Sequence, residues 1–457
     1  MNPSFNKMLY KFNIQKENNE NSIILNMQIA FENLRNTWKK YYPLINFIKS
    51  FKEAFNSKPI NVKTQQDSDE FLAILCDEIE KEGKKYNMEN CLEESFKGKI
   101  SNEIISLEKE YPYYSCRDEP FFKLTLDIKG HKSLEEALDF YIKEEILEGE
   151  NKYFVDKYNK KISISKRCSI KKMSNTVIIH LKRFEFDYYT FTNNKLNDYL
   201  KFPLEINFQK WTKAYLNMKK DNNLISEEER EYLIDNKLNY QLTGILIHSG
   251  STLAHGHYYS FIMDQQNGKW FKFDDTKISC FDINNIEYES FGGNIENNYY
   301  SQFNSQNAYL LFYTRKDSIS FNKFNNQFFV SQYIQNLVKK ENEDFWKVKI
   351  FLSDNFFFFF QKIIDYESKV GFYKEIEERY NNFKKMIQIE KDNNLYNASN
   401  KEIYDKWQEE IQIRNEKNKE NKNLISEKIQ RLKNIPQMTQ DIFSKFMLYY
   451  YICEKNI

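Results

Sequence analysis

The sequence predicts an α+β fold, and three observations lead to that class. Apolar runs rich in β-branched and aromatic residues recur between residues 175 and 314, which is the pattern of strands. Charged segments with helical periodicity precede and follow them, at residues 1–100 and beyond residue 316. Aromatic residues make up 17% of the 457 residues, whereas glycine and proline number only 11 and 7, so the composition favours a packed core over disorder.

The charge balance and the apolar runs exclude several classes of protein. Lys and Arg number 67 against 66 Asp and Glu, so no basic excess indicates nucleic-acid binding. The apolar run at residues 356–360 is followed by Gln361 and Lys362 and is too short to span a membrane. No long apolar stretch follows Met1, which predicts no secretory signal. Six scattered cysteines without a CxxC pair predict reduced thiols in a cytoplasmic protein, with the nucleus as a second location.

The first part of the chain is predicted to be mainly helical. Residues 67–70 (DSDE) can cap a helix and place negative charge at its N-terminus. The apolar face of this helix is formed by Phe71, Leu72, Leu75 and Ile79.

The middle of the chain is predicted to carry the strands. Residues 175–186 begin as a continuous apolar run and then alternate, which is the pattern of a strand buried first on both faces and then on one. Residues 205–238 are polar and helix-forming, and we predict that they are a solvated insertion. We therefore divide the chain into a domain at residues 1–315 and a helical extension at residues 316–457.

Scarce residue types gather in one stretch of the chain. Six of the 11 glycines and three of the five histidines lie between residues 244 and 293. Within that stretch the turn signal QQNG (265–268) joins two apolar runs, at residues 257–263 and 270–273. We expect an antiparallel hairpin, with His257 and Asp274 near its open end.

Two registers of this hairpin are open. A turn centred on residues 265–266 places His257 opposite Asp274, whereas a turn made of residues 267–268 alone pairs His257 with Ile278. Either register brings a histidine close to a carboxylate at a rim lined with glycine. A carboxylate orients an imidazole and stabilises its cation, as a general base that serves a thiol or hydroxyl requires.

Two other interpretations of the pair stay open. A histidine beside an aspartate on a neighbouring strand is more often structural than catalytic. His255 and His257 also share one face of a strand, and Asp274 and Asp275 are able to extend a metal shell, but a further convergent ligand is missing. We predict no metal. We expect His248 to be a polar residue at a strand end.

Five segments in order resemble the ubiquitin-specific proteases, which are papain-like thiol isopeptidases that remove ubiquitin. One of them resembles the family's Gln/Asp box, one its central strand, one its His box and one its closing strand. The stretch from CFDINN to SFGGNIEN resembles the fat-facets-like branch of the family. The five segments are TQQDSDEFLAIL (64–75), VIIHLKRFEFD (177–187), LKFPLEINF (200–208), LTGILIHSGSTLAHGHYYSFIMDQQNGKWFKFDDTKIS (242–279) and NAYLLFYTR (307–315).

The resemblance implies a papain-like fold with a helical thumb (here incomplete), a β-rich palm and fingers, followed by the helical extension. It aligns His257 with the family's catalytic base and Asp274 with its orienting carboxylate. Asp67 and Glu70 align with residues that hold the ubiquitin tail, whose guanidinium group two carboxylates one helical turn apart can receive. The implied partners are ubiquitin and ubiquitinated proteins, and no cofactor is expected.

Two of these implied roles have a plain alternative or a local departure. Without the resemblance, Asp67 and Glu70 are equally well explained as a cap at a helix start. Gly256 would let the narrow Gly-Gly end of the tail run close to the backbone. The sequence reads His-Gly-His at this point, where relatives often have Gly-Gly-His.

The predicted fingers depart from the family pattern. Relatives usually carry a zinc ribbon of two CxxC pairs, whereas the matching places here read LEKE (107–110) and YFVDKYNKK (153–161). No thiolate ligand is present in either segment, so we predict no zinc. The fingers would then be held by aromatic side chains, namely Tyr111, Tyr113, Tyr114, Phe154 and Tyr158.

The second departure concerns the nucleophile. In the family the Gly-Asn-Thr-Cys-Tyr box precedes a helix that continues into a Pro-x-Phe stretch. Asn2–Phe5 resembles that stretch, so the chain begins just after the expected cysteine. We expect Cys76 to be buried, and Cys280 lies past Asp274. We therefore predict that the chain as written does not hydrolyse isopeptides. It is either a fragment or mis-started sequence of a ubiquitin-specific protease or a non-catalytic ubiquitin-binding scaffold; a weaker third hypothesis makes residues 316–457 a partner-binding platform.

Overall fold

The chain divides into two compact units, which are described separately. One comprises Met1–Arg35 and Tyr42–Gln335, and the other comprises Asn36–Tyr41 and Asn336–Ile457. The domain boundary between residues 315 and 316 stays a prediction. A computed structural model of the chain describes residues 3–14, 21–52, 66–188, 191–220, 225–234, 238–250, 256–297, 300–319, 330–351 and 385.

Helices at the start of the chain pack around an apolar core of their own. The helix predicted after Asp67 is present, and Asp67 caps it by accepting the Asp69 N–H at 2.8 Å. Glu82 on the same helix accepts the N–H groups of Ile23 (2.8 Å) and Ile24 (3.2 Å), so it satisfies the N-terminus of the second helix. The helices are α1 (Pro3–Leu9), α2 (Ile23–Asn36), α3 (Ile45–Lys49) and α4 (Ser68–Lys84).

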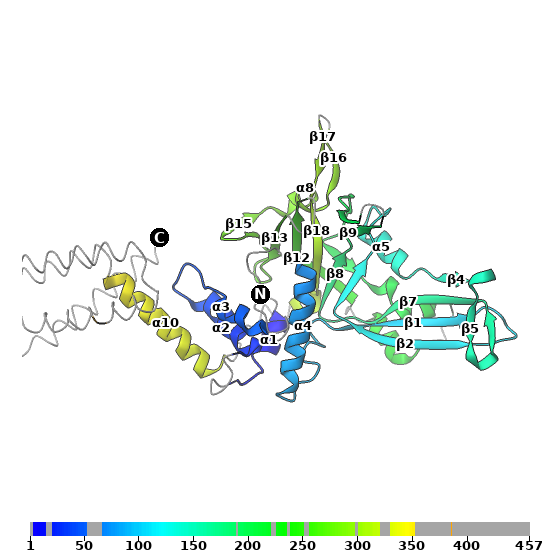
Figure 1. Ribbon diagram of the computed structural model, residues 1–457, viewed down its shortest axis with the longest axis horizontal. Helices are drawn as coiled ribbons and strands as arrows, with labels where there is room; N and C mark the ends of the chain where they lie inside the picture. Colours follow the sequence, from blue (N-terminus) through cyan, green and yellow to red (C-terminus); the bar gives the residue numbers. More distant parts are fainter. Residues whose placement is uncertain are drawn as a thin grey trace, which may run out of the picture. The chain divides into compact units, whose positions relative to one another are not determined.

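The palm sheet carries the main core of the first unit. In the described residues it has eight strands in the order β15-β14-β13-β12-β18-β8-β3, with β11 paired to β12. All neighbours are antiparallel except β3 and β8. Strand β18 comes last in the chain yet lies between β12 and β8 (Figure 1). The strands are β3 (Lys123–Leu126), β8 (Thr176–Leu181), β11 (Glu205–Asn207), β12 (Asn239–Ser249), β13 (His257–Met263), β14 (Trp270–Asp274), β15 (Lys277–Phe281) and β18 (Gln306–Arg315).

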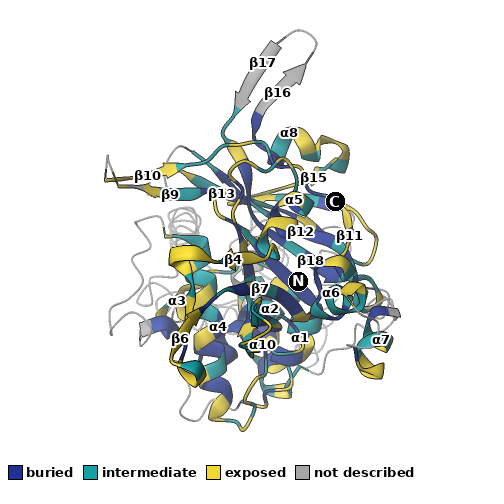
Figure 2. Ribbon diagram, turned by 90° about the vertical axis from the view of Figure 1, so that its right-hand side faces the viewer, coloured by how far each residue is buried: buried dark blue, intermediate teal, exposed yellow. Residues whose placement is uncertain are grey.

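The central strands are buried as their sequences predict. In β8, Val177, Ile178 and Ile179 are at most 1% exposed. The chain then becomes half-exposed, and Phe186 is 45% exposed. Strands β12 and β18 are likewise mostly buried (Figure 2). These continuous apolar strands are covered on both faces, which places the sheet in the middle of the core.

The fingers sheet extends away from the palm (Figure 1). Its strand order is β2-β1-β7-β4, and a small hairpin of β5 and β6 lies at its tip. The sheet is formed by β1 (Gly98–Ser106), β2 (Tyr114–Phe121), β4 (Glu145–Leu147) and β7 (Ile164–Lys172), and the hairpin by β5 (Tyr153–Val155) and β6 (Lys160–Ile162).

The tip of the fingers holds an apolar cluster of Val155, Ile162 and Ile164. Of the five aromatic side chains predicted to hold the tip, three pack against this cluster: Tyr111, Tyr113 and Tyr158.

The expectation is wrong for Tyr114 and Phe154, which are 59% and 46% exposed. Neighbouring residues of an extended chain point to opposite faces, so Tyr113 and Tyr114 cannot both face the cluster. Tyr114 instead donates its hydroxyl to Glu103 Oε1 at 2.8 Å.

The segment at residues 205–238 contributes a few buried apolar side chains to the main core. It forms β11, α6 (Lys213–Lys220) and α7 (Glu227–Ile234). Its charged side chains are mostly exposed, as an insertion predicts, but Phe208, Trp211 and Ala214 are buried in the main core. Polar composition therefore hides a few apolar contacts that tie the segment to the palm.

The α-helices and strands not yet given lie around the palm or begin the helical extension. They are α5 (Leu134–Tyr141), β9 (Phe184–Asp187), β10 (Thr192–Lys195), α8 (Ile286–Ser290), β16 (Gly293–Asn297), β17 (Tyr300–Asn304) and α10 (Gln332–Phe351). In the second unit, Asn342 Nδ2 donates to Asn36 O at 2.7 Å, and the rings of Trp38 and Trp346 meet edge to face at 5.6 Å. The apolar run at residues 356–360 and Cys453 lie outside the described residues. None of the described helices has the length and apolarity that a bilayer crossing demands.

Candidate active site

His257 and Asp274 meet at the open end of β13 and β14. His257 begins β13 and Asp274 ends β14, and the imidazole Nε2–H donates to Asp274 Oδ1 at 2.6 Å. Both side chains are partly exposed, at 44% and 37%. The hydrogen bond from His257 holds the pKa of the Asp274 carboxyl below its usual range. The ionised carboxylate fixes the imidazole, which leaves Nδ1 as the nitrogen that can accept a proton.

The hairpin register lies midway between the two that the sequence left open. Continuing the observed pairing of β13 with β14 by one residue places Asp274 opposite Tyr259, not His257. The turn closes at Asp264, whose N–H donates to Lys269 O at 2.8 Å. His257 and Tyr259 are two residues apart on one face of β13, so the carboxylate reaches His257 along the diagonal.

Asp67 lies at the N-terminus of α4, against the palm. Both of its carboxylate oxygens are 3.0 Å from the Tyr309 hydroxyl, which donates to them. Burial and then the charge of Asp67 raise the pKa of Tyr309, so the hydroxyl keeps its proton. Glu70, three residues further along α4, is exposed and has no ion-pair partner in the described part of the chain. The cap at Asp67 is observed, and contact of Asp67 and Glu70 with a ligand stays a prediction.

Two residues at this site, Tyr258 and Tyr309, were missed by sequence reasoning. Tyr258 follows His257 and therefore points to the opposite face of β13, where it lies beside Ser68 at the start of α4. Burial, then the charge of Asp67, raises the pKa of Tyr258 to about 12. Asp67, Ser68, Tyr258 and Tyr309 form a polar group that we call the α4 edge. The sequence signal that could have found Tyr258 is its place next to His257 in a predicted strand, because neighbouring side chains of a strand point to opposite faces.

Gly256 is required by the protein's own packing. A Cβ at this position would lie 2.7 Å from both His248 Cε1 and Ser249 O, which is closer than real Cβ contacts. The histidine ring therefore occupies the space beside Gly256. A role for Gly256 in admitting a ligand backbone stays a prediction.

His248 is at a strand end, as expected, but it is fully buried, with 0% exposure. Its ring packs edge to face against Phe184 and Tyr258, and neither ring nitrogen has a hydrogen-bond partner among the described residues. Burial, then the nearby charge of Lys195, lowers the pKa of His248 to about 4. The ring is neutral and acts as a packing group.

A metal site at this rim stays without support from a further ligand. His257, Asp274 and Asp275 present potential ligand atoms within 4.8 Å of one another. The His257–Asp274 hydrogen bond already accounts for the proximity of two of them, and Asp275 is exposed. His255 lies outside the described residues. The prediction of no metal remains a prediction.

None of the described cysteines hydrogen-bonds to His257. Cys76 is 4% exposed, as predicted, and burial raises its pKa to about 12. Cys280 pairs with Phe271 on β14, three residues along the strand from Asp274, which amounts to about 10 Å. A thiol that serves this imidazole is therefore not supplied by the residues that the structure describes.

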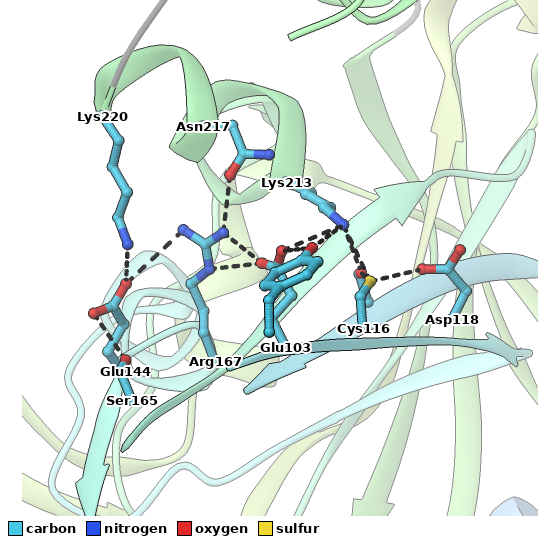
Figure 3. A network of polar contacts seen from close by, with 11 residues as sticks. Glu103, Cys116, Asp118, Glu144, Ser165, Arg167, Lys213, Asn217 and Lys220 are labelled. Atoms are coloured by element: carbon cyan, nitrogen blue, oxygen red, sulfur yellow. Dashed lines mark hydrogen bonds and ion pairs between the residues drawn. The ribbon is translucent and has the colours of Figure 1, made fainter. Parts of the chain in front are cut away.

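The described thiol with a lowered pKa lies elsewhere, on the fingers sheet. Cys116 Sγ is 3.1 Å from Ser101 Oγ and 3.2 Å from Lys213 Nζ (Figure 3). Burial opposes ionisation, but the contacts from Ser101, Lys213 and Tyr114 outweigh it and lower the pKa of Cys116.

Comparisons with known proteins agree with the motifs. The family described as ubiquitin carboxyl-terminal hydrolase matches residues 1–313. The chain is 33% identical over 338 residues to Ubiquitin carboxyl-terminal hydrolase 24 of Mus musculus, a match that covers 69% of this chain and 13% of the mouse protein. It is 33% identical over 312 residues to Probable ubiquitin carboxyl-terminal hydrolase FAF of Drosophila melanogaster, which covers 65% of this chain and 11% of the fly protein.

Among solved structures, the chain resembles the SAGA Ubp8/Sgf11/Sus1/Sgf73 DUB module bound to ubiquitin aldehyde. The TM-score is 0.45 at 24% identity, and the match covers 59% of this chain and 53% of that one.

Proposed function

The chain belongs to the ubiquitin-specific proteases of the ubiquitin carboxyl-terminal hydrolase family, whose α+β papain-like fold it has, and on this premise we propose that its site serves thiol-dependent hydrolysis of isopeptide bonds at the C-terminal glycine of ubiquitin. His257 is the base and Asp274 its orienting carboxylate. The observation that carries the proposal is the 2.6 Å hydrogen bond between His257 Nε2 and Asp274 Oδ1.

The proposed chemistry follows from that geometry. A thiol gives its proton to His257 Nδ1, and the thiolate attacks the carbonyl carbon of the terminal glycine. The imidazolium then protonates the departing lysine amine, and water releases ubiquitin from the acyl-enzyme. Asp274 holds Nε2–H throughout, so the same tautomer is restored after each proton transfer.

We place the ubiquitin tail at the α4 edge. Asp67 and the exposed Glu70 put two carboxylates one helical turn apart, and a guanidinium group of the tail can pair with them. Isothermal titration with ubiquitin tests this. Glu70→Gln should weaken binding about fivefold, and ubiquitin truncated before its terminal Arg-Gly-Gly should bind both forms equally weakly.

Asp77→Asn is the matched control for that titration. It removes one carboxylate from the same helix, where Asp77 pairs with Lys81 on the exposed surface at 2.7 Å. The control should leave the affinity within twofold of the parent chain. Equal losses in the two variants would contradict a tail site at Glu70.

We further propose that the 457-residue chain does not turn over substrate by itself, because no described thiol lies at His257. A ubiquitin probe with a C-terminal electrophile should form no adduct with the purified chain. Iodoacetamide should still alkylate Cys116, which shows that the thiols are reduced and reactive. An adduct of the probe with any of the six cysteines would contradict the proposal.

The catalytic and non-catalytic versions of this function are separated by one fusion. A Gly-Asn-Thr-Cys-Tyr box with the helix that follows it in relatives, joined in frame to Met1, should give a protein that cleaves a fluorogenic ubiquitin amide, and the same segment with Ser in place of Cys should not. Failure of both forms, with ubiquitin still bound, favours the scaffold hypothesis. The transcript upstream of the Met1 codon then shows which version the cell makes.

The proposed partners follow from the family, and the proposed location follows from the cysteines. Ubiquitin and ubiquitinated proteins are the partners. The five cysteines in the described residues, namely Cys76, Cys91, Cys116, Cys168 and Cys280, are free, which supports a reducing compartment, the cytoplasm or the nucleus. Cell fractionation with an antibody to the chain checks the location.

A further inference from the structure

Lys195, the last residue of β10, gathers three backbone carbonyls around one ammonium group. Its Nζ donates to His248 O at 2.9 Å, to Gly250 O at 3.1 Å and to Ser305 O at 2.7 Å. No carboxylate lies within ion-pair distance of Lys195 among the residues that the structure describes. The charge is therefore held by carbonyl dipoles alone.

The three carbonyls lie at the end of the palm sheet where β13 begins with His257. His248 and Gly250 flank Ser249, which pairs with His257 on one side and with Gln306 on the other. Ser305 directly precedes Gln306 at the start of β18. One ammonium group thus fixes the ends of the two strands beside His257.

The protonation state of Lys195 matters to this arrangement. An ammonium group has three N–H donors for three carbonyls, whereas a neutral amine has two and turns a lone pair toward the third. Burial, then the charge of Arg183, lowers the pKa of Lys195 to about 7.

Among the described residues, the charged and titratable groups that face Lys195 are Arg183 and His248. Arg183 is fully buried and donates to Ala308 O, Leu196 O and Asp198 O at 3.1, 3.3 and 2.6 Å. It belongs to the same set of cation-to-backbone contacts.

We propose that Lys195 is a positioning residue, which holds the backbone beside His257 so that the imidazole meets Asp274. The proposal deepens the proposed function, because it gives that His–Asp pair the support that fixes its geometry. Lys195 does not touch the reacting atoms and acts through Ser249 and its neighbours.

The test compares Lys195→Met with Lys213→Met in the full chain. Lys213 is the matched control, a lysine of 13% exposure that contacts Glu103 in the fingers sheet. Nuclear magnetic resonance of the histidine rings, with His257→Gln for assignment, reports the hydrogen-bonded Nε2–H of His257. Hydrogen exchange reports the backbone at residues 257–259.

In Lys195→Met we expect the Nε2–H signal of His257 to broaden or vanish and exchange at residues 257–259 to rise at least about tenfold, the effect of about 1.4 kcal/mol of local stability. Lys213→Met should leave both unchanged and raise exchange in the fingers. Unchanged His257 signals in a folded Lys195→Met protein would overturn the proposal. Should that variant not fold, Lys195→Gln, whose amide serves two of the three carbonyls, decides in the same way.

The outcome for the proposed function is read separately. Isothermal titration of ubiquitin with the parent chain tests whether the site binds its substrate. If Lys195→Met loses the His257 signals but the parent chain does not bind ubiquitin, the positioning role is retained and the proposed function is rejected. If the parent chain binds ubiquitin but the signals of a folded Lys195→Met protein are unchanged, the function is retained and the positioning role is rejected.

Discussion

The fingers sheet and the palm rim behind His257 hold buried charge in different ways. In the fingers, buried Glu103 receives Arg167 Nε at 2.9 Å and Lys213 at 3.3 Å, so opposite charges meet (Figure 3). In the part of the rim that the structure describes, Lys195 and Arg183 donate hydrogen bonds only to backbone carbonyls, and His248 has no hydrogen-bond partner. We call Lys195, Arg183 and His248 the rim set.

The difference decides where the protein is sensitive to pH. Burial alone would raise the pKa of Glu103, but Arg167 and Tyr114 outweigh it and lower the pKa, so the charge persists at neutral pH. Among the described residues no opposite charge offsets burial at Lys195 or His248, and the pKa falls to about 7 for Lys195 and about 4 for His248. At Arg183 the charge of Asp198 offsets part of the burial, and the pKa falls only to about 9. Paired charges stabilise over a wide pH range, whereas the ammonium group of Lys195, which only carbonyls hold in the described structure, is close to neutralisation at neutral pH.

The largest expected effect comes from breaking a pair in the fingers. Arg167→Met leaves Glu103 buried without its main partner, and we expect a loss of about 3–5 kcal/mol in the free energy of unfolding, measured by urea denaturation at pH 7. Adding Glu103→Met removes the stranded charge. The double variant should recover most of the loss, and a double variant less stable than the single one would contradict the pairing argument.

An intermediate effect is expected from the rim. His248 has a folded pKa of about 4 against about 6.5 in the unfolded chain, so between these values the unfolded chain binds more protons and stability falls as the pH falls. His248→Leu removes this penalty. Relative to the parent, the free energy of unfolding of the variant should rise by about 2 kcal/mol when the pH is lowered from 8 to 5, measured by urea denaturation at both values.

Tyr158→Phe in the fingers is the contrast for the histidine variant. It removes a hydroxyl that donates to Pro112 O at 2.7 Å and should cost about 1 kcal/mol at both pH values. A similar pH dependence in the two variants would remove the distinction between the regions.

The smallest effect is expected at the tip of the fingers. Glu108 accepts Lys152 Nζ at 2.7 Å and Ser163 N–H at 2.8 Å, and these bonds lower its pKa to about 2. Its stabilisation is present above the unfolded pKa of about 4.3 and is lost as the pH falls toward 2. Glu108→Gln should lower the melting temperature by a few degrees at most at pH 6. It should also make the melting temperature fall less steeply as the pH is lowered toward 2. A steeper fall in the variant than in the parent, measured by calorimetry, would contradict the stabilising role of the ionised Glu108.

Local patterns predicted much of this molecule because their causes are local. The N-cap at Asp67, the buried strand around Ile178 and the hairpin that carries His257 all depend on residues close in sequence. The proximity of His257 and Asp274 followed from the hairpin alone.

The features that sequence reasoning missed depend on distant residues or on side chains within turns. Lys195 bonds to carbonyls 53 to 110 residues away, and Tyr309 bonds to Asp67 across 242 residues, so no periodicity marks either. The hairpin register was missed because the turn spans residues 265–268, where Asp264 Oδ1 accepts the Gln266 N–H at 3.0 Å and Asn267 Oδ1 accepts the Lys269 N–H at 2.8 Å.

The place of β18 in the palm has a consequence for synthesis. Its partners β8 and β12 end at Leu181 and Ser249, but β18 itself runs from Gln306 to Arg315. Until the ribosome has delivered that last strand, both partners present open hydrogen-bonding edges and the sheet cannot close. A nascent chain stalled or truncated before Gln306 should therefore recruit chaperones and aggregate, even though most of the palm's apolar residues have already been made.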